Sequence, residues 1–489
     1  MTTIPSLLLA LLSLKSPCLV DKDNILSLET WQLSERIQDR SLSCVELMEA
    51  TIERIDQVNS DHNALISMMD SNLLLDRAKI MDKLLDNNQS MGWLHGIPTA
   101  VKDLCDAKGF PKSMGGSPLC NKATPADESE PYINQLEEAG AIVIGKTNTP
   151  EYGLGSHTFN KRFGTTLNPR DPSKSAGGSS GGAAVAVATH MLCFADGTDV
   201  MGSLRNPAGW NGIYSHRPTA GLLDDNPPTN SVLSYPIGTA GPMARSPLDL
   251  AKLLETMIQD DSNFSSGDIR EHLNAVSSTE SLTIGWLGDW GGSYPMEDGV
   301  LETCEGALDQ ILTTLGMNVE DLVSTELYPA DQMWTNWNRL RFVATADKFE
   351  GALDDDIVRL KPDLQWEIEQ GRKVSRADLI EAAETASDYS QELGKYFGRI
   401  EILALPSAQL FPFPAEWDWP RSIADKDMDT YHRWMEVCIP ASLAGLPCTT
   451  IPAGIGSKSG LPMGLTLFGP RGKDMKLLQV ANTITDCMQ

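Results

Sequence analysis

Two glycine-containing turns place serine side chains where acyl-transfer chemistry is feasible. The first turn, 175–182, leads directly into the small apolar run 183–188. A glycine turn that opens onto a buried helix lets backbone N–H groups approach a ligand closely. The second turn, 196–207, places Ser203 directly after Gly202. A serine on such a turn can act as a nucleophile beside backbone N–H donors, as acyl transfer requires.

Other interpretations of the first turn fit the sequence less well. No Gly-Lys-Ser/Thr follows it, which excludes a Walker A loop, and it lacks the strand and downstream acidic residue of a dinucleotide site. A Gly/Ser run can also be a flexible linker. The apolar run that follows contradicts a linker.

A serine nucleophile needs a base, and neither turn contains a histidine. His190 lies in the predicted apolar helix, and we expect a structural role for His216. Lysine is the other option, because burial lowers the pKa of an amine and allows it to accept a proton. Lys102 follows the apolar run 97–101 at a predicted strand end. A solvated pair with Asp103 is the alternative interpretation of this lysine.

The elements that must position these residues alternate along the chain. Short apolar runs predict strands at 97–101, 141–144, 282–286, 401–405, 449–452 and 463–467. Helical patterns occupy 27–59 (broken near 39–41), 128–139, 300–316, 331–347, 376–397 and 473–486. Ser43 and Glu46 have capping-box spacing, which predicts a helix start. We therefore predict an α/β fold: one large domain with a mixed central β-sheet covered by helices on both faces.

Composition excludes several functional classes. The 489 residues carry a net charge of −27, which disfavours binding to nucleic acid or anionic lipid. The nine cysteines are widely spaced and form no CxxC pair, so we expect free thiols in a reducing compartment. The seven histidines do not cluster with the cysteines, and we expect neither a metal site nor a cofactor.

We expect residues 1–26 to be an N-terminal extension and residues 27–489 to form the large domain. The apolar run 7–12 is far shorter than the roughly 20 residues that span a bilayer. No Lys or Arg precedes it and no small-x-small cleavage site follows, which disfavours a signal peptide. We expect a cytoplasmic protein without a membrane span. A secreted or periplasmic location is the alternative if the run is a signal segment.

Several motifs, dispersed along the chain in a fixed order, resemble the amidase signature family of Ser-Ser-Lys hydrolases. They are Gly96-Ile97-Pro98 with Lys102-Asp103, the segment 145–153, the loop 177–182, the turn 199–207, and the fainter segments 444–447 and 460–465. The resemblance covers residues 28–486. It implies that the domain 27–489 is an amidase domain with the amidase signature fold.

The resemblance also implies roles for individual residues. It implies Ser203 as nucleophile, Ser179 as bridging serine after a cis Gly178–Ser179 peptide, and Lys102 as base. The implied oxyanion hole consists of the backbone N–H groups of Val200, Met201, Gly202 and Ser203. The implied supporting residues are Ser180, Asp199 and Arg205. The implied substrate-pocket residues are Tyr152, Leu154, Met201 and Trp210.

The activity implied is hydrolysis of a carboxylic amide through an acyl-enzyme. A small apolar or aryl amide is favoured, with esters and carbamates left open. The expected partners are a small-molecule amide and water, without nucleic acid, and a homodimer is compatible with the resemblance. One alternative is the glutamine-hydrolysing A subunit of a tRNA-dependent amidotransferase, which the −27 charge disfavours. The other is a catalytically silent binding protein on the same fold.

The sequence departs from the family pattern beside the nucleophile. Met201 stands where most members have glycine. A positive φ would strain a methionine, so we expect either an ordinary φ or a local adaptation there. The flexible thioether would then shape the acyl pocket. The tryptophan-rich stretches 417–420 and 431–434 are candidates for an aromatic wall, with core packing as the alternative.

Overall fold

A mixed sheet of eight strands forms the centre of the molecule, in the order β10-β9-β11-β15-β14-β7-β8-β6. The computed structural model describes residues 22–120, 124–223, 237–258, 273, 282–322 and 328–488. The strands are β6 (Phe194–Asp199), β7 (Tyr214–Arg217), β8 (Thr239–Ala244), β9 (Thr283–Trp286), β10 (Asn318–Asp321), β11 (Ile402–Pro406), β14 (Cys448–Ile455) and β15 (Pro462–Phe468). β9 pairs with β10 and β11 in parallel, and the other pairs are antiparallel. The predicted mixed sheet is confirmed.

A second sheet brings the lysine strand to the edge of the first. It contains β1 (Leu65–Ile66), β3 (Ile142–Thr147) and β2 (Pro98–Lys102), in that order. β2 packs beside β6, and the backbone N–H of Lys102 donates to Asp196 Oδ1 at 2.9 Å. Two hairpins complete the strands, β4 (Phe159–Asn160) with β5 (Gly164–Thr165) and β12 (Ser422–Ile423) with β13 (Lys426–Asp427). The end of β2 therefore lies next to the end of β6.

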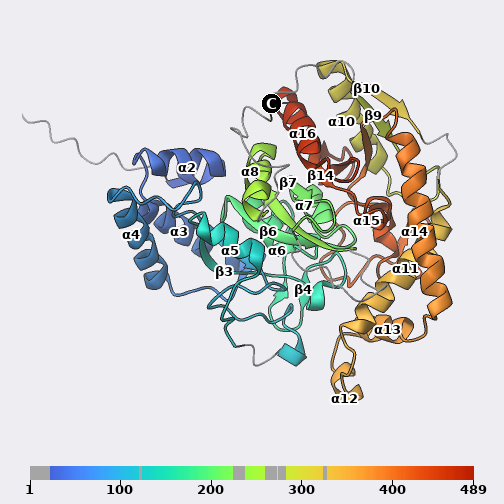
Figure 1. Ribbon diagram of the computed structural model, residues 1–489, viewed down its shortest axis with the longest axis horizontal. Helices are drawn as coiled ribbons and strands as arrows, with labels where there is room; N and C mark the ends of the chain where they lie inside the picture. Colours follow the sequence, from blue (N-terminus) through green and yellow to red (C-terminus); the bar gives the residue numbers. More distant parts are fainter. Residues whose placement is uncertain are drawn as a thin grey trace, which may run out of the picture.

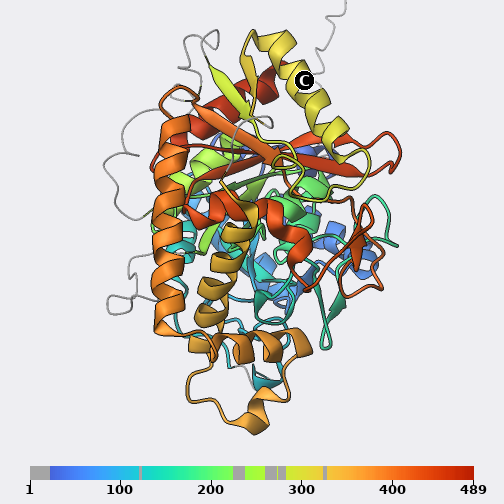
Figure 2. The ribbon, with the colours of Figure 1, turned by 90° about the vertical axis from the view of Figure 1, so that its right-hand side faces the viewer.

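Helices flank the sheets. Those near the N-terminus lie at one end of the molecule (Figure 1): α1 (Lys22–Ser27), α2 (Thr30–Gln38), α3 (Cys44–His62) and α4 (Ser71–Asp86). At the opposite end, the long α14 (Arg376–Tyr396) packs along α11 (Ala330–Asp347) (Figure 2). Below them lie α12 (Asp354–Ile357) and α13 (Pro362–Gly371). The remaining helices are α5 (Pro131–Glu138), α6 (Gly181–Ala188), α7 (Arg205–Asn211), α8 (Pro247–Met257), α10 (Val300–Leu315), α15 (Ile439–Leu443) and α16 (Asp474–Met488).

The predicted elements are confirmed with small shifts at their ends. The helical pattern 27–59 breaks as expected into α2 and α3. Ser43 Oγ accepts from the backbone N–H of Glu46, whose carboxylate accepts from Ser43 N in return. The prediction missed α4, although its buried residues Leu74, Ala78, Met81 and Leu85 recur at helical spacing. That recurrence was the available signal for this helix.

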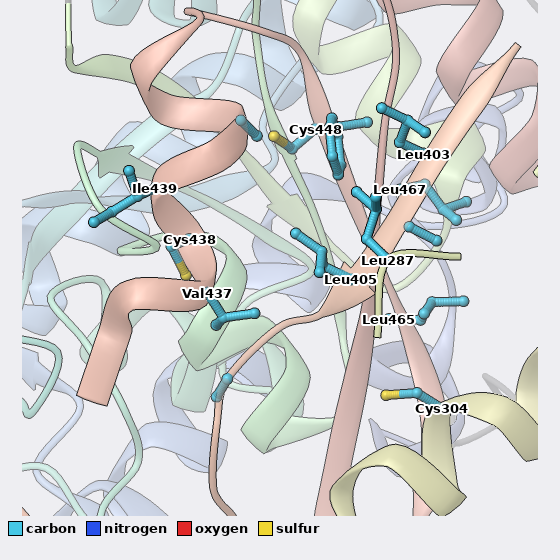
Figure 3. Close-up of a cluster of buried hydrophobic side chains, with 14 of the residues drawn as sticks. Leu287, Cys304, Leu403, Leu405, Val437, Cys438, Ile439, Cys448, Leu465 and Leu467 are labelled. Carbon is cyan, nitrogen blue, oxygen red and sulfur yellow. The ribbon is translucent and has the colours of Figure 1, made fainter. Parts of the chain in front are cut away.

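The core of the sheet is built from leucines of its central strands. Leu403 and Leu405 of β11 and Leu465 and Leu467 of β15 gather with buried thiols such as Cys304 (Figure 3). The predicted free thiols are confirmed for seven cysteines: Cys44, Cys105, Cys120, Cys193, Cys304, Cys438 and Cys448. Cys18, the side chain of Cys487 and the apolar run 7–12 lie outside the described residues. Among the described helices, none has the length and hydropathy to cross a bilayer.

A buried ion-pair network joins the elements that carry the second glycine turn. Asp199 ends β6, Arg205 begins α7 and Arg217 ends β7. Arg205 Nη2 and Arg217 Nε lie 2.8 and 3.6 Å from Asp199 Oδ1. Arg205 also donates to Ser442 Oγ in α15 at 2.7 Å and to the carbonyl of Cys438 at 2.9 Å. Burial alone would raise the pKa of Asp199, but the two guanidinium groups outweigh burial and hold it well below its usual range.

Replacing Asp199 with Asn leaves two buried guanidinium groups without their carboxylate. We expect the free energy of unfolding to fall by about 3–5 kcal/mol at pH 7. Because the pKa of this carboxyl is lower in the folded than in the unfolded protein, its contribution is present above about pH 4 and declines as the pH falls further. Urea unfolding at pH 7 and pH 3 measures both effects.

The matched control is Asp298→Asn, which removes an exposed carboxylate paired with Lys458. It should change stability by less than about 1 kcal/mol. Equal losses for the two variants would contradict the structural role assigned to the buried network.

Candidate active site

The side-chain amine of Lys102 is surrounded by hydroxyl groups. Its Nζ lies 2.8 Å from Ser179 Oγ, Ser180 Oγ and Thr198 Oγ1. The side chain is completely buried, and burial lowers the pKa of Lys102 to about 8. A neutral amine in this position can accept a proton from a neighbouring hydroxyl.

Asp103 is not the solvated partner of Lys102 that the alternative interpretation required. Its carboxylate is completely buried and accepts from the backbone N–H groups of Ser113 and Gly115, each at 3.0 Å. Ser113 Oγ donates to the same carboxylate. Asp103 therefore organises the loop that follows β2.

The first glycine turn holds Ser179 against the lysine. The Gly178–Ser179 peptide is cis, as the resemblance implied. The turn leads into α6, whose residues are buried throughout. A Cβ at Gly182 would lie 2.4 Å from the backbone nitrogen of Asn148, so only glycine allows this close packing. The backbone N–H of Ser180 donates to the carbonyl of Ser203 at 3.2 Å, which links the two turns.

The second turn uses the carboxylate of Asp199 as its anchor. Gly202 has a φ of +91°, and a Cβ there would lie 2.5 Å from Cys438 Sγ. The backbone N–H groups of Gly202 and Leu204 donate to Asp199 at 2.9 and 3.0 Å. Four backbone N–H groups were expected in the oxyanion hole. The N–H of Gly202 is not available for it, because it already donates to the Asp199 carboxylate. Val200, Met201 and Ser203 have N–H groups with no acceptor among the described residues.

Met201 is accommodated without backbone strain. The left-handed φ falls on Gly202, whereas Met201 has an ordinary φ. The methionine side chain is buried, and Trp337 Nε1 of α11 donates to its Sδ at 3.3 Å. The residue that departs from the family pattern is thus held by a specific contact.

A cavity of about 520 Å³ lies beside the two serines. Ser179, Ser203 and Thr198 form part of its wall. The expected pocket residues Tyr152, Leu154 and Met201 line it as well. Its larger apolar and aromatic lining residues also include Leu104, Met114, Tyr132, Val200, Ile237, Phe349, Leu364 and Met435.

Trp210 does not line this cavity, which corrects the expectation for it. The indole is completely buried and stacks on Trp434 with ring centroids 5.8 Å apart. Its Nε1 donates to the carbonyl of Leu410 at 3.0 Å. Core packing, the alternative for the tryptophan-rich segments, therefore describes Trp210 and Trp434.

Sequence reasoning missed the part of the cavity wall that α11 and its C-cap residue Lys348 supply. Arg341, Ala344, Thr345 and Lys348 all face the cavity. Their spacing puts them on one face of a helix, but spacing alone does not show what that face contacts.

In the described part of the chain, no three His, Cys, Asp or Glu side chains are grouped to hold a metal ion.

Comparison with known proteins places this chain in a family. A family model described as Amidase matches residues 46–478. Among curated relatives, the A subunit of the glutamyl-tRNA(Gln) amidotransferase of Nitrosomonas europaea is 31% identical, over 92% of this chain and 95% of that protein. An acylamidase of Rhodococcus erythropolis is 26% identical, over 94% and 95% of the two chains.

Solved structures share the fold over nearly the whole chain. A bacterial aryl acylamidase of the amidase signature family superposes with a TM-score of 0.84 at 24% identity, covering 94% of this chain and 96% of that one. A crystal structure described as an amidase gives a TM-score of 0.81 at 27% identity, covering 94% and 99%. The chain therefore belongs to the amidase family and is a hydrolase of amide C–N bonds.

Proposed function

We propose that this chain hydrolyses amides through an acyl-enzyme on Ser203, with Ser179 and Lys102 as the proton relay. The observation that carries the proposal is the 2.8 Å hydrogen bond between Lys102 Nζ and Ser179 Oγ. Ser179 and Ser203 share one cavity wall, and their turns are joined by a backbone hydrogen bond. These contacts support a base, a bridging hydroxyl and a nucleophile that act in turn on a substrate in the cavity.

The first chemical step forms the acyl-enzyme. Neutral Lys102 accepts a proton from Ser179 while Ser179 accepts one from Ser203, and Ser203 Oγ attacks the carbonyl carbon. The oxyanion that develops is stabilised by the free N–H groups of Val200, Met201 and Ser203. Loss of one such donor typically costs about 10²–10³ in rate.

The remaining steps expel the amine and release the acid. Ser179 donates a proton to the leaving nitrogen and regains one from protonated Lys102, because an amide nitrogen leaves poorly unless it is protonated. Water then enters and gives a proton to the same relay as it attacks the acyl-enzyme. Collapse of the second tetrahedral intermediate returns Ser203 to its hydroxyl form.

The cavity favours an apolar or aryl amide. Its wall is formed largely by Leu, Met, Ile, Val, Phe and Tyr side chains. Tyr152 and Phe349 meet edge to face with centroids 4.9 Å apart, which gives the wall an aromatic surface. The relative named as an acylamidase supports an acyl amide as the substrate. Esters and carbamates react through the same tetrahedral geometry.

The second candidate is the glutaminase subunit of a tRNA-dependent amidotransferase. The relatives of that name, up to 31% identical, favour it. The net charge of −27 favours a small-molecule amidase instead, because tRNA is itself an anion. Ammonia release from glutamine that depends on a partner protein would establish this candidate. Turnover of apolar anilides by the isolated chain would exclude it as the main activity.

Fluorophosphonate labelling tests the proposed nucleophile. We expect the native protein to be labelled at Ser203 and to hydrolyse aryl anilides, because the relay activates that hydroxyl. Ser203→Ala should abolish both signals, with anilide turnover falling by at least about 10⁴. Intact-mass and peptide mass spectrometry locate the label.

The exposed Ser90 provides the control: Ser90→Ala should keep wild-type labelling and turnover. If folded native protein is not labelled at Ser203, the acyl-enzyme mechanism is wrong. The catalytically silent alternative then gains support.

The pH dependence of kcat/KM tests the base. Protonated Lys102 cannot accept a proton, so activity should rise through about pH 8 as the lysine loses its proton. Lys102→Met should lower kcat/KM by several orders of magnitude and remove this rising limb. Lys79→Met, which removes an exposed lysine paired with Asp76, serves as the control. An unchanged limb in Lys102→Met would show that another group is the base.

A further inference from the structure

We propose that Lys348 forms an anion subsite in the active-site cavity, so that the preferred substrate is an apolar amide carrying a carboxylate remote from the scissile bond. The inference rests on the proposed function, since it assigns a substrate class to the same cavity. The supporting observation is the arrangement of charged side chains on the α11 side of the cavity wall.

The helix geometry directs Lys348 to the cavity. Arg341, Ala344, Thr345 and Lys348 occupy positions i, i+3, i+4 and i+7, and all four line the cavity. Trp337, one turn earlier on the same face, contacts Met201 beside the nucleophile. This face of α11 therefore runs from the catalytic turn to Lys348.

The other cation on this face is already neutralised. Arg341 Nε donates to Glu367 Oε1 at 2.6 Å, and Arg341 Nη2 donates to Tyr431 Oη at 2.6 Å. Tyr431 donates to Glu367 Oε1 and Thr345 to Glu367 Oε2, at 2.5 and 2.9 Å. Both oxygens of the Glu367 carboxylate therefore accept hydrogen bonds. Glu367 and Arg341 form a buried ion pair.

Lys348 is left as the uncompensated charge. The charges of both Arg341 and Glu367 act on the Lys348 amine. Among the described residues, however, Lys348 forms no ion pair with either of them or with another carboxylate. The side chain is exposed. The only carboxylate lining this cavity within the described chain is Glu130, which belongs to the wall near Cys105 and Tyr132. The α11 wall therefore carries an excess positive charge in a chain whose net charge is −27.

The apolar side chains of the cavity wall favour a substrate whose body, apart from the carboxylate, is apolar. Phe349, Leu364 and Met435 line the cavity together with Lys348 and Thr345. A carboxylate beside Lys348 would gain a charge-assisted hydrogen bond. The apolar body of the same molecule would contact these side chains while its amide lies at Ser203. A neutral ester of the same shape would keep the apolar contacts and lose the ionic one.

Direct binding to Ser203→Ala protein tests the subsite without requiring turnover. Two matched pairs cover both sides of the amide: 4-acetamidobenzoate with its methyl ester, and succinanilate with its methyl ester. Isothermal titration calorimetry should show one carboxylate binding roughly tenfold or more tightly than its own ester. Adding Lys348→Met should remove that preference, and raising the salt concentration should weaken it.

Lys83 supplies the matched control, since it is an exposed lysine in the last turn of α4 and does not line the cavity. Lys83→Met should keep the preference for the carboxylate. The subsite is overturned if both carboxylates bind no better than their esters, or if the preference survives in Lys348→Met. The nucleophile is judged separately by labelling of Ser203, so failure of one proposal is distinguishable from failure of the other.

Discussion

The proposed proton relay depends on one constraint: an amine must be buried and still be able to accept a proton. Lys102 meets it because its hydrogen-bond partners in the described structure are hydroxyls and the carbonyl of Thr198, whereas a direct carboxylate partner would fix the charged form. The two carboxylates that act electrostatically on Lys102 are engaged elsewhere. Asp196 accepts from the backbone of Lys102 and from Tyr132, and Asp199 is paired with two arginines.

The fold supplies this environment by joining distant segments. β2 brings the lysine, α6 and its preceding turn bring Ser179, and the end of β6 brings the turn of Ser203. Asp199 serves both as an ion-pair partner and as the acceptor that shapes the Ser203 turn through Gly202 and Leu204. The same buried charge therefore contributes to stability and to the direction of the free N–H groups.

Much of this could be predicted from the sequence. Apolar runs located β2, β3, β9, β11, β14 and β15, but not β6, β7, β8 and β10 of the central sheet. The ordered motifs located Lys102, Ser179 and Ser203, which the structure brings together. The strain considered for Met201 is absent, because the turn places its positive φ on Gly202. The sequence did not predict what each helix face or aromatic side chain contacts in the folded protein. Trp210 was expected in the pocket, yet its indole packs in the core, because an aromatic residue near a site motif is compatible with either role.

Two further differences have the same origin. The α11 face of the cavity was missed because a helical pattern at 331–347 identifies the helix but not its neighbour. Gly202 was expected among the oxyanion donors, and only the folded turn shows its N–H bound to Asp199. Tertiary contacts between segments decide both cases, as they do for Trp210.

The proton relay requires Lys102 to be largely neutral at mildly alkaline pH in the folded protein. A pH titration of the ¹⁵N chemical shift of its side-chain nitrogen in native protein measures this, with the resonance assigned by its loss in Lys102→Met. We predict a pKa of about 8. A value near 10.4, that of a solvated lysine, would contradict the role of Lys102 as the base.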